Sequence, residues 1–341
     1  MKILIDSSGP PYFLAHGGAE TQVMQTVSGL RELGVEVEFA RWWDGKQSAD
    51  LIHFFGVPSS GYLQFARAKR LPVVSTTLFT ATCNRSPRQL ALQGFMVSTL
   101  LKIPAIPPWG SIRGQLTWKS FGECDMNIVG LEAEARVLET VYGLTRKQIG
   151  IVPLGLSEPF LQAGPGTRQH SYLITTGTIT ERKRSVELAK MAHLAKVPIC
   201  FVGKPYDEKS AYWKEFQSLV DGAVVTHIPH TESIQEMIGL LQGARGYVLF
   251  SDYENWCLSA HEAIACGLPI LVPDQPWSRE LFGAQARYFS GWDIEHNAGT
   301  LSEFHSTCDS IPVPKIKLYS WRECATKLLP IYESLISIVR R

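Results

Sequence analysis

The stretch GYVLFSDYENWCLSAHEAIACGLPILVPD, residues 246–274, decides the fold. GYVLFS is apolar enough for a buried strand, LSAHEAIAC has a helical composition, and LPILVPD indicates a second buried strand. A strand, a helix and a strand in this order predict one unit of a parallel sheet. The turn between the first strand and the helix then lies at the carboxyl end of a parallel strand, where open α/β sheets bind ligands.

Outward from this stretch, short apolar segments alternate with helix-length segments. The strand candidates of the first half are KILIDSSG, VEVEFARWW, DLIHFFG, LPVVSTT and DMNIVG. This alternation predicts a parallel sheet with helices on both faces. After the Gly- and Pro-containing SEPFLQAGPGTRQH, the pattern restarts with a strand SYLITTG, a helix ERKRSVELAKMAHLA and a strand VPICFVG. The predicted fold class is therefore α/β, with two doubly wound, Rossmann-like domains in tandem.

The domain boundaries follow from this restart. A chain of 341 residues is too long for one ordinary core, and two domains imply a cleft. We expect an N-terminal domain at 1–156, a linker at 157–170, a C-terminal domain at 171–319, and a final helix at 320–341 that packs back on the N-terminal domain. Pro330 lies in the middle of that helix, so we expect a kink or break there.

The composition is that of a globular protein, with 45% hydrophobic residues and a formal net charge of +1. The seven cysteines are scattered without a CxxC spacing, which favours reduced thiols over a disulfide framework or a zinc site. No apolar stretch approaches the roughly 18 residues needed to span a bilayer. We therefore expect a cytoplasmic protein.

Several nucleotide-binding motifs are absent from the sequence. There is no GxGxxG after a strand and no GxxxxGK[ST], which weakens a dehydrogenase or NTPase interpretation. There is also no Asp-x-Asp after a strand that could hold a divalent cation on a diphosphate, so no metal site is expected. If a diphosphate binds, backbone amides and basic side chains must hold it.

Two carboxylates, Glu254 and Glu262, flank the turn within the opening stretch. The helix is expected to begin near Leu258 or Ser259, and its first N–H groups then form an anion site. Carboxylates bind phosphate poorly but accept hydrogen bonds from sugar hydroxyls well. The spacing therefore predicts one acid for each sugar of a nucleotide-sugar, with the pyrophosphate between them.

Each of these signals has a structural alternative. Ser259 and Glu262 also fit a capping box, in which the two side chains satisfy the helix-end amides alone. Glu254 by itself fits a solvated loop acid, and Lys183 within ERKRS fits a charged helix start. The pair Gly17 and Gly18 fits an ordinary chain turn.

The segment from Glu254 to Glu262 resembles the E-x7-E motif of the retaining glycosyltransferases of family GT4, which have the GT-B fold of two Rossmann-like domains facing a cleft. HGGAETQVMQTVSGLRELGVEVEF, IVPLGL and LITTGTITERKRSVELAK also follow the order of this family. The resemblance implies that Glu254 contacts the donor sugar and Glu262 the nucleotide ribose. Gly17 and Gly18 would approach the donor phosphate through bare backbone.

The sequence also departs from the family pattern. Gly177-Thr178 stands where Gly-Arg is common, although Lys183 matches the lysine that follows. Arg182 or Arg184 is a candidate to replace the missing cation. VVSTTLF lacks the histidine of many members, and the usual Gly-Phe-Gly after the first Glu is Asn-Trp-Cys at residues 255–257.

The function implied by the resemblance is a retaining, metal-independent transfer of sugar from a UDP- or GDP-linked donor to a hydroxyl acceptor, with no further cofactor. Glu254 and Lys183 are the catalytic candidates. The binding candidates are Gly17, Gly18, Arg182, Lys183, Glu254, Leu258, Ser259 and Glu262. Two rivals stay open, a nucleotide-sugar epimerase of the same fold and a catalytically inactive nucleotide-sugar binder.

One further feature lies outside the family motifs. The segment from Leu51 to Gly122 contains no Asp or Glu but eight Lys or Arg residues. Within it, bases alternate with Leu, Phe, Met and Trp, as in segments that contact anionic lipid. We expect a glycan or lipid-linked acceptor and peripheral contact with the inner face of an anionic membrane, and no nucleic acid. The alternative is a merely basic surface.

Overall fold

A computed structural model describes residues 1–8, 17–77, 81–103, 118–231 and 233–340. The chain forms two compact units. The first contains residues 1–14, 19–155 and 321–341, and the second contains 15–18 and 156–320.

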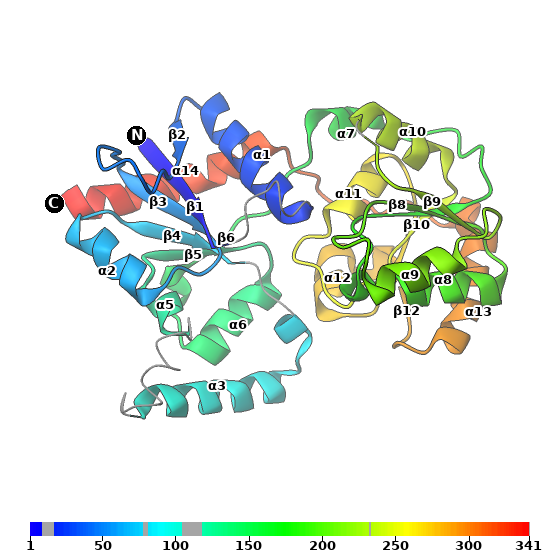
Figure 1. Ribbon diagram of the computed structural model, residues 1–341, viewed down its shortest axis with the longest axis horizontal. Helices are drawn as coiled ribbons and strands as arrows, with labels where there is room; N and C mark the ends of the chain where they lie inside the picture. Colours follow the sequence, from blue (N-terminus) through cyan, green and yellow to red (C-terminus); the bar gives the residue numbers. More distant parts are fainter. Residues whose placement is uncertain (9–16, 78–80, 104–117, 232, 341) are drawn as a thin grey trace. The chain divides into compact units, whose positions relative to one another are not determined.

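The N-terminal unit is built on a six-stranded parallel sheet in the order β2-β1-β3-β4-β5-β6. Its strands are β1 (Lys2–Ser7), β2 (Glu36–Phe39), β3 (Leu51–Phe55), β4 (Val73–Thr76), β5 (Met126–Val129) and β6 (Ile149–Ile151). Its α-helices are α1 (Gly18–Glu32), α2 (Ser60–Ala68), α3 (Pro87–Lys102), α5 (Trp118–Glu123), α6 (Glu132–Tyr142) and α14 (Trp321–Arg340). Figure 1 shows α1 and α14 on one side of the sheet, α2, α5 and α6 on the other, and α3 beyond α6.

The C-terminal unit is built on a second six-stranded parallel sheet in the order β12-β11-β10-β7-β8-β9. Its strands are β7 (Leu173–Thr176), β8 (Ile199–Val202), β9 (Val225–Ile228), β10 (Gly246–Val248), β11 (Ile270–Pro273) and β12 (Arg287–Phe289). Its α-helices are α7 (Glu158–Ala163), α8 (Ser185–Ala195), α9 (Ala211–Leu219), α10 (Ile234–Gly243), α11 (Leu258–Ala265), α12 (Pro276–Phe282) and α13 (Ile294–Thr307).

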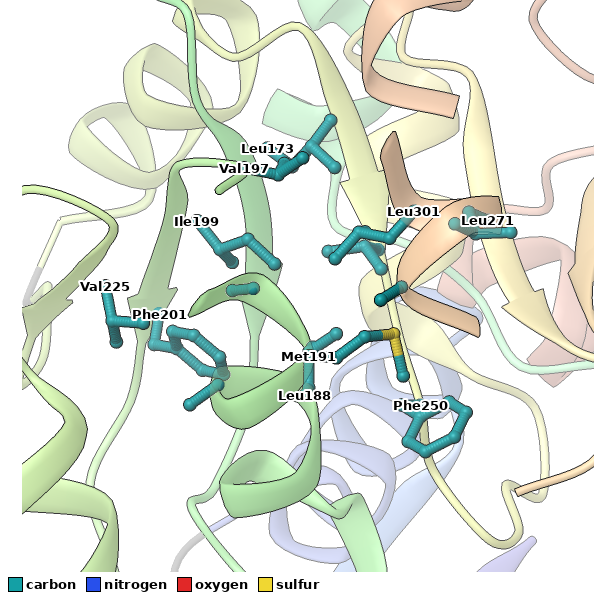
Figure 2. Close-up of a cluster of buried hydrophobic side chains, with 14 of the residues drawn as sticks. Leu173, Leu188, Met191, Val197, Ile199, Phe201, Val225, Phe250, Leu271 and Leu301 are labelled. Atoms are coloured by element: carbon teal, nitrogen blue, oxygen red, sulfur yellow. The ribbon is translucent and has the colours of Figure 1, made fainter. Parts of the chain in front are cut away.

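Apolar side chains of the strands and of α8 and α13 form the core on one face of the second sheet. Figure 2 shows Leu188 and Met191 of α8 beside the strand residues Ile199 and Phe201, with Leu301 of α13 nearby. All five side chains are almost completely buried. The strands β8, β10 and β11 are apolar and buried along their whole length, as expected for parallel strands covered by helices on both faces.

Two parallel sheets with helices on both faces confirm the predicted α/β class. Each unit is doubly wound, because strand order reverses next to its first strand. In the C-terminal unit β7 lies between β8 and β10, and the chain leaves β7 and β10 toward opposite edges of the sheet. The carboxyl ends of β7 and β10 therefore form the topological switch point, where ligands of such sheets bind.

Several local expectations differ from the structure. Residues 157–170, expected as a linker, include the helix α7 and group with the C-terminal unit. The prediction of a break at Pro330 is wrong, since α14 continues across this residue. The buried side chains Leu328 and Tyr332 lie on both sides of the proline, so packing holds the helix together there.

The cysteines and the helices agree with a reduced protein core and bear on membrane insertion. All seven cysteines are free and buried. Within the described ranges, no helix combines the length and apolar character that a membrane span requires.

Candidate functional site

The candidate site lies at the switch point of the C-terminal sheet. Gly177 and Thr178 directly follow β7, and the segment that leads from β10 to α11 contains Ser251 to Cys257. Since β7 and β10 are hydrogen-bonded neighbours, these two segments start side by side at the same edge of the sheet. The sequence motifs from two distant parts of the chain therefore meet within one unit.

The end of β7 is tightly constrained by the end of β8. Gly203 follows β8 with φ of 151°, and a Cβ built on it would lie 2.0 Å from the carbonyl oxygen of Gly177. Gly177 itself has φ of 138° and lies against the Lys183 side chain. Only residues without a Cβ fit both requirements, so this close approach fixes the backbone that carries Thr178.

A small cavity adjoins this backbone. Thr176, Gly177, Thr178, Lys183 and Leu249 are among its lining residues. The buried Thr176 hydroxyl has no hydrogen-bond partner in the described part of the chain. A buried polar group of this kind calls for a water or a ligand atom.

Lys183 belongs to a separate turn rather than to the predicted helix start. Residues Glu181–Lys183 form a 3-10 helix, and Arg184 takes the left-handed conformation with φ of 50° before α8 begins. The Thr180 side chain accepts a hydrogen bond from the Lys183 amide and so caps this turn. The turn directs Lys183 away from the helix surface and toward the end of β10.

Glu254 is the centre of an ion-pair cluster. Its Oε1 accepts from Lys183 Nζ at 2.7 Å and from Arg182 Nη1 at 2.9 Å. Glu254 is only 8% exposed, and the Lys183 side chain is 12% exposed, whereas half of the Arg182 side chain is accessible. The structural alternative of a solvated loop acid is therefore wrong for Glu254.

The backbone around Glu254 is held by further hydrogen bonds. Arg182 Nη1 donates to the Tyr253 carbonyl at 2.5 Å, and the Asp252 amide donates to the Arg182 carbonyl at 2.9 Å. The Ser251 hydroxyl lies 3.2 Å from the same Arg182 carbonyl. These contacts bind the 3-10 turn to the segment after β10, and they preorganise the cations at the site.

Opposing effects act on the Glu254 carboxyl. Burial raises its pKa, but the charges of Lys183 and Arg182 outweigh burial, and the pKa is lowered from its ordinary value of 4.5. Glu254 is therefore ionised at neutral pH.

Arg184 is used elsewhere. Its guanidinium pairs with the carboxylate of Asp252 and lies 4.3 Å from the ring centroid of Trp292. Of the two candidates for the missing cation, Arg182 is thus the one that joins Lys183 and Glu254.

The start of α11 contradicts the capping-box alternative. Cys257 is the N-cap residue, it takes the left-handed conformation with φ of 55°, and its side chain makes no cap hydrogen bond. The Ser259 hydroxyl instead accepts from the Tyr247 hydroxyl at 2.7 Å. The partly buried Ser259 side chain is therefore held against β10 through Tyr247.

Two amides at this helix start remain available. The third amide of the helix, Ala260 N–H, donates to the Cys257 carbonyl at 3.1 Å. The Leu258 and Ser259 N–H groups donate to no atom of the described chain. Together they form the positive end of the helix macrodipole.

Glu262 lies on α11, eight residues after Glu254 in the chain. Its carboxyl makes no hydrogen bond or ion pair with the residues that the structure describes. Burial raises its pKa to about 7, and only the Lys183 charge opposes this effect. A partly buried carboxyl without a partner can accept hydrogen bonds from ligand hydroxyls.

Gly17 and Gly18 stand at the start of α1 but group with the C-terminal unit. Gly17 has φ of 137°, and a Cβ built on it would lie 3.4 Å from the Tyr206 hydroxyl. A Cβ on Gly18 would meet no atom within 4 Å. The backbone conformation of Gly17 is one that residues with a side chain rarely adopt, so glycine is required there. Gly18 has no such requirement.

Sequence reasoning missed four residues of this site: Thr176, Tyr247, Ser251 and Asp252. Thr176 lies in β7, Tyr247 lies in β10, and Ser251 and Asp252 follow β10 within four residues. Their positions near the carboxyl ends of predicted strands were the available signal. The partners of Ser251 and Tyr247 could not be predicted, because Arg182 and Ser259 come from other elements.

Comparison with solved structures identifies the architecture. A sucrose-phosphate synthase from Thermosynechococcus elongatus superposes with a TM-score of 0.65 at 14% identity, covering 99% of both chains. The fold is GT-B. The Anabaena protein HepE in complex with UDP and glucose shares this GT-B fold with a TM-score of 0.60 at 13% identity, covering 99% of this chain and 97% of HepE. A glycosyltransferase from Rickettsia africae gives 0.62 at 10% identity over 98% of both chains.

Comparison with family models concerns the second unit of the GT-B fold. Residues 167–302 match the model described as "Glycosyl transferases group 1". This range contains Lys183, Glu254 and Glu262, and the match supports a glycosyltransferase. No protein with a curated description matches the sequence.

Proposed function

We propose that this protein transfers a sugar from a nucleotide-diphosphate donor to a hydroxyl acceptor. The observation that carries the proposal is the cluster of Lys183, Arg182 and Glu254 beside the open amides of α11, inside the range that matches the glycosyltransferase model. Two cations and two amides provide positive charge for a diphosphate. Two acids provide acceptors for hydroxyl groups.

The donor diphosphate is proposed to bind between Lys183 and the start of α11. Lys183 has three N–H donors, so it can keep its ion pair with Glu254 while it binds a phosphate oxygen. When the bond between the sugar and the diphosphate breaks, negative charge accumulates on the leaving phosphate. Lys183, Arg182 and the Leu258 and Ser259 amides would then stabilise the transition state more than the ground state.

The two acids are proposed to have different roles. Glu254, held in place by two cations, would orient the donor sugar at the reacting carbon and would position Lys183. Glu262 would accept a hydrogen bond from a ribose hydroxyl. This division follows the E-x7-E motif of the family GT4 resemblance, which also implies retention of the anomeric configuration.

Cations of the chain itself support a metal-independent reaction, because Lys183 and Arg182 can neutralise the diphosphate charge. Among the similar structures, HepE binds UDP and glucose, and a pneumococcal O-GlcNAc transferase binds UDP and GlcNAc. UDP is therefore the first donor nucleotide to test, with GDP as the alternative. The proposed acceptor is a glycan or a lipid-linked saccharide of polysaccharide biosynthesis.

An assay of nucleoside diphosphate release from UDP- and GDP-sugars, with a panel of glycan and lipid-linked acceptors, tests this proposal. Acceptor-dependent release together with a new glycoside supports it. A changed donor sugar without any acceptor identifies an epimerase instead. Donor binding without release under every acceptor identifies an inactive binder.

Paired variants sharpen the assay. Glu254→Ala is expected to lower kcat far more than it weakens donor binding, and Glu262→Ala is expected to weaken binding chiefly. Glu303→Ala, an exposed acid on α13, serves as the matched control and should change neither quantity. Equal effects of Glu254→Ala and Glu262→Ala on both quantities would contradict the assigned roles.

A further inference from the structure

The helix α3 occupies an unusual place in the N-terminal unit. It packs against α6 and not against the sheet, so it forms an outer layer (Figure 1). Its buried residues are Leu90, Gly94 and Val97, which lie on one face. A Cβ on Gly94 would lie 2.2 Å from the Thr140 carbonyl oxygen, so glycine permits a close contact between the two helices.

The opposite face of α3 is apolar and exposed. Leu92, Phe95 and Met96 are 61%, 69% and 49% exposed. Spacings of three and four residues place them on one stripe, on the other side of the helix from Leu90 and Val97. A helix with one docked apolar face and a second exposed apolar stripe has a surface that water does not favour.

Positive charge borders this stripe. Arg88 lies one turn before Leu92, Lys102 ends the helix, and Arg85 precedes it. Arg85 donates to Gln93, and no acid in the described chain forms an ion pair with Arg88 or Lys102. Helix α3 itself contains no Asp or Glu.

The acids of the neighbouring helix α6 do not neutralise this charge. Glu132 pairs with Arg146 at 2.5 Å, and Glu139 lies 3.9 Å from the same guanidinium. Glu134 is buried and accepts from the Gly130 and Leu131 amides at its own helix start. The acids of α6 are thus used locally, and the face of α3 stays positive.

From these observations we propose that the stripe Leu92, Phe95 and Met96, with Arg88 and Lys102, is a docking surface for an anionic lipid bilayer. The apolar side chains would enter the headgroup region, and the two bases would contact lipid phosphates. An apolar stripe bordered by bases that pair with no acid of the described residues fits this occupant by charge complementarity. The surface is independent of the proposed sugar transfer, because it needs neither donor nor acceptor.

Vesicle sedimentation with the full-length protein tests the proposal. Phosphatidylcholine vesicles with and without phosphatidylglycerol are compared, in the absence of any nucleotide-sugar. We expect sedimentation with the phosphatidylglycerol vesicles that decreases with added salt, and little with phosphatidylcholine alone. Equal sedimentation with both kinds of vesicle would overturn the proposal.

Two sets of variants locate the contact. Phe95→Ser with Met96→Ser is expected to weaken partitioning by about tenfold through the loss of apolar burial. Arg88→Gln with Lys102→Gln is expected to weaken it by about tenfold on anionic vesicles only. Ile338→Ser, which removes a 64% exposed apolar side chain from α14 of the same unit, is the matched control and should leave partitioning unchanged.

Circular dichroism and melting temperatures show whether each variant is folded. If Phe95→Ser with Met96→Ser does not fold, the double variant Arg88→Gln with Lys102→Gln still tests the proposal. Unchanged partitioning in a folded form of either set would overturn the proposal. A wild-type dimer in light scattering that Phe95→Ser with Met96→Ser converts to a monomer would also overturn it, since the stripe would then bind a second copy of the chain.

Discussion

At the scale of single residues, Glu254 combines deep burial with two cationic partners. Replacing it with Gln leaves Lys183 without a charged partner in a poorly accessible place. We expect Glu254→Gln to lower the free energy of unfolding by about 1–3 kcal/mol and kcat by about 100-fold. Chemical denaturation and turnover measurements check both values, with Glu303→Gln as control. Wild-type turnover in a folded Glu254→Gln variant would remove Glu254 from the catalytic assignment.

Glu262 predicts a dependence of stability on pH. Its pKa is about 7 in the folded protein and 4.5 ordinarily. As pH rises from 4.5 to 7, the unfolded chain releases this proton while the folded chain keeps it, so the wild type loses stability in this window. Glu262→Gln does not titrate. The melting temperature of Glu262→Gln minus that of the wild type should therefore increase as pH rises from 4.5 to 7. A difference in melting temperature that does not change with pH would contradict the burial of Glu262.

The same residues show what sequence could predict. The strand-turn-helix pattern predicted a helix that starts near Leu258, between Glu254 and Glu262, and α11 begins at Leu258. The left-handed Cys257 could not be predicted, since this conformation disfavours a side chain and the sequence gives no glycine. The ion pairs of Glu254 depend on a distant turn, since Arg182 precedes Glu254 by 72 residues, and local patterns do not describe such contacts.

At the scale of elements, the close approach of β7 and β8 positions the backbone beside Lys183. Gly203→Ala places a Cβ 2.0 Å from the Gly177 carbonyl oxygen, in a conformation that side chains disfavour. We expect a loss of about 3 kcal/mol in the free energy of unfolding and weaker nucleotide binding. Gly239→Ala on α10, where a Cβ meets no atom within 4 Å, should stabilise by about 0.5–1 kcal/mol. Equal stabilities of the two variants in urea denaturation would contradict the packing of β7 on β8.

Element positions were largely predictable, whereas element boundaries near the site were not. Apolar runs with helix-length spacers predicted most strands of both sheets, because buried parallel strands need apolar residues on both faces. The short edge strands β6 and β12 were not among the predicted strands. The segment ERKRSVELAKMAHLA was expected as one helix, but it divides into a 3-10 turn and α8 at the left-handed Arg184. Contacts of Arg184 with Asp252 and Trp292 accompany this division, and they involve parts of the chain far away in sequence.

At the scale of the whole molecule, the chain returns to its first unit through α14. The buried Tyr332 hydroxyl lies 2.6 Å from His53 Nδ1, and His53 Nε2 lies 2.6 Å from the Thr76 hydroxyl. Burial lowers the pKa of His53 to about 3, so the ring stays neutral. Tyr332→Phe leaves a buried ring nitrogen unpaired and should cost about 1–3 kcal/mol. Ile338→Ala, at an exposed position, should change stability by less than about 0.5 kcal/mol, and a similar change in both would contradict a structural role of this hydrogen bond.

The central claim is that the switch point of the C-terminal unit binds a nucleoside diphosphate through Lys183, the α11 amides and Glu262. Isothermal titration of the full-length protein with UDP, GDP and ADP tests it most directly. We predict that one of the three binds with a micromolar dissociation constant, and that Lys183→Ala and Glu262→Ala each weaken this binding by about tenfold or more while Glu303→Ala does not. Binding of none of the three nucleotides, or equal affinity of all four proteins, would contradict the claim.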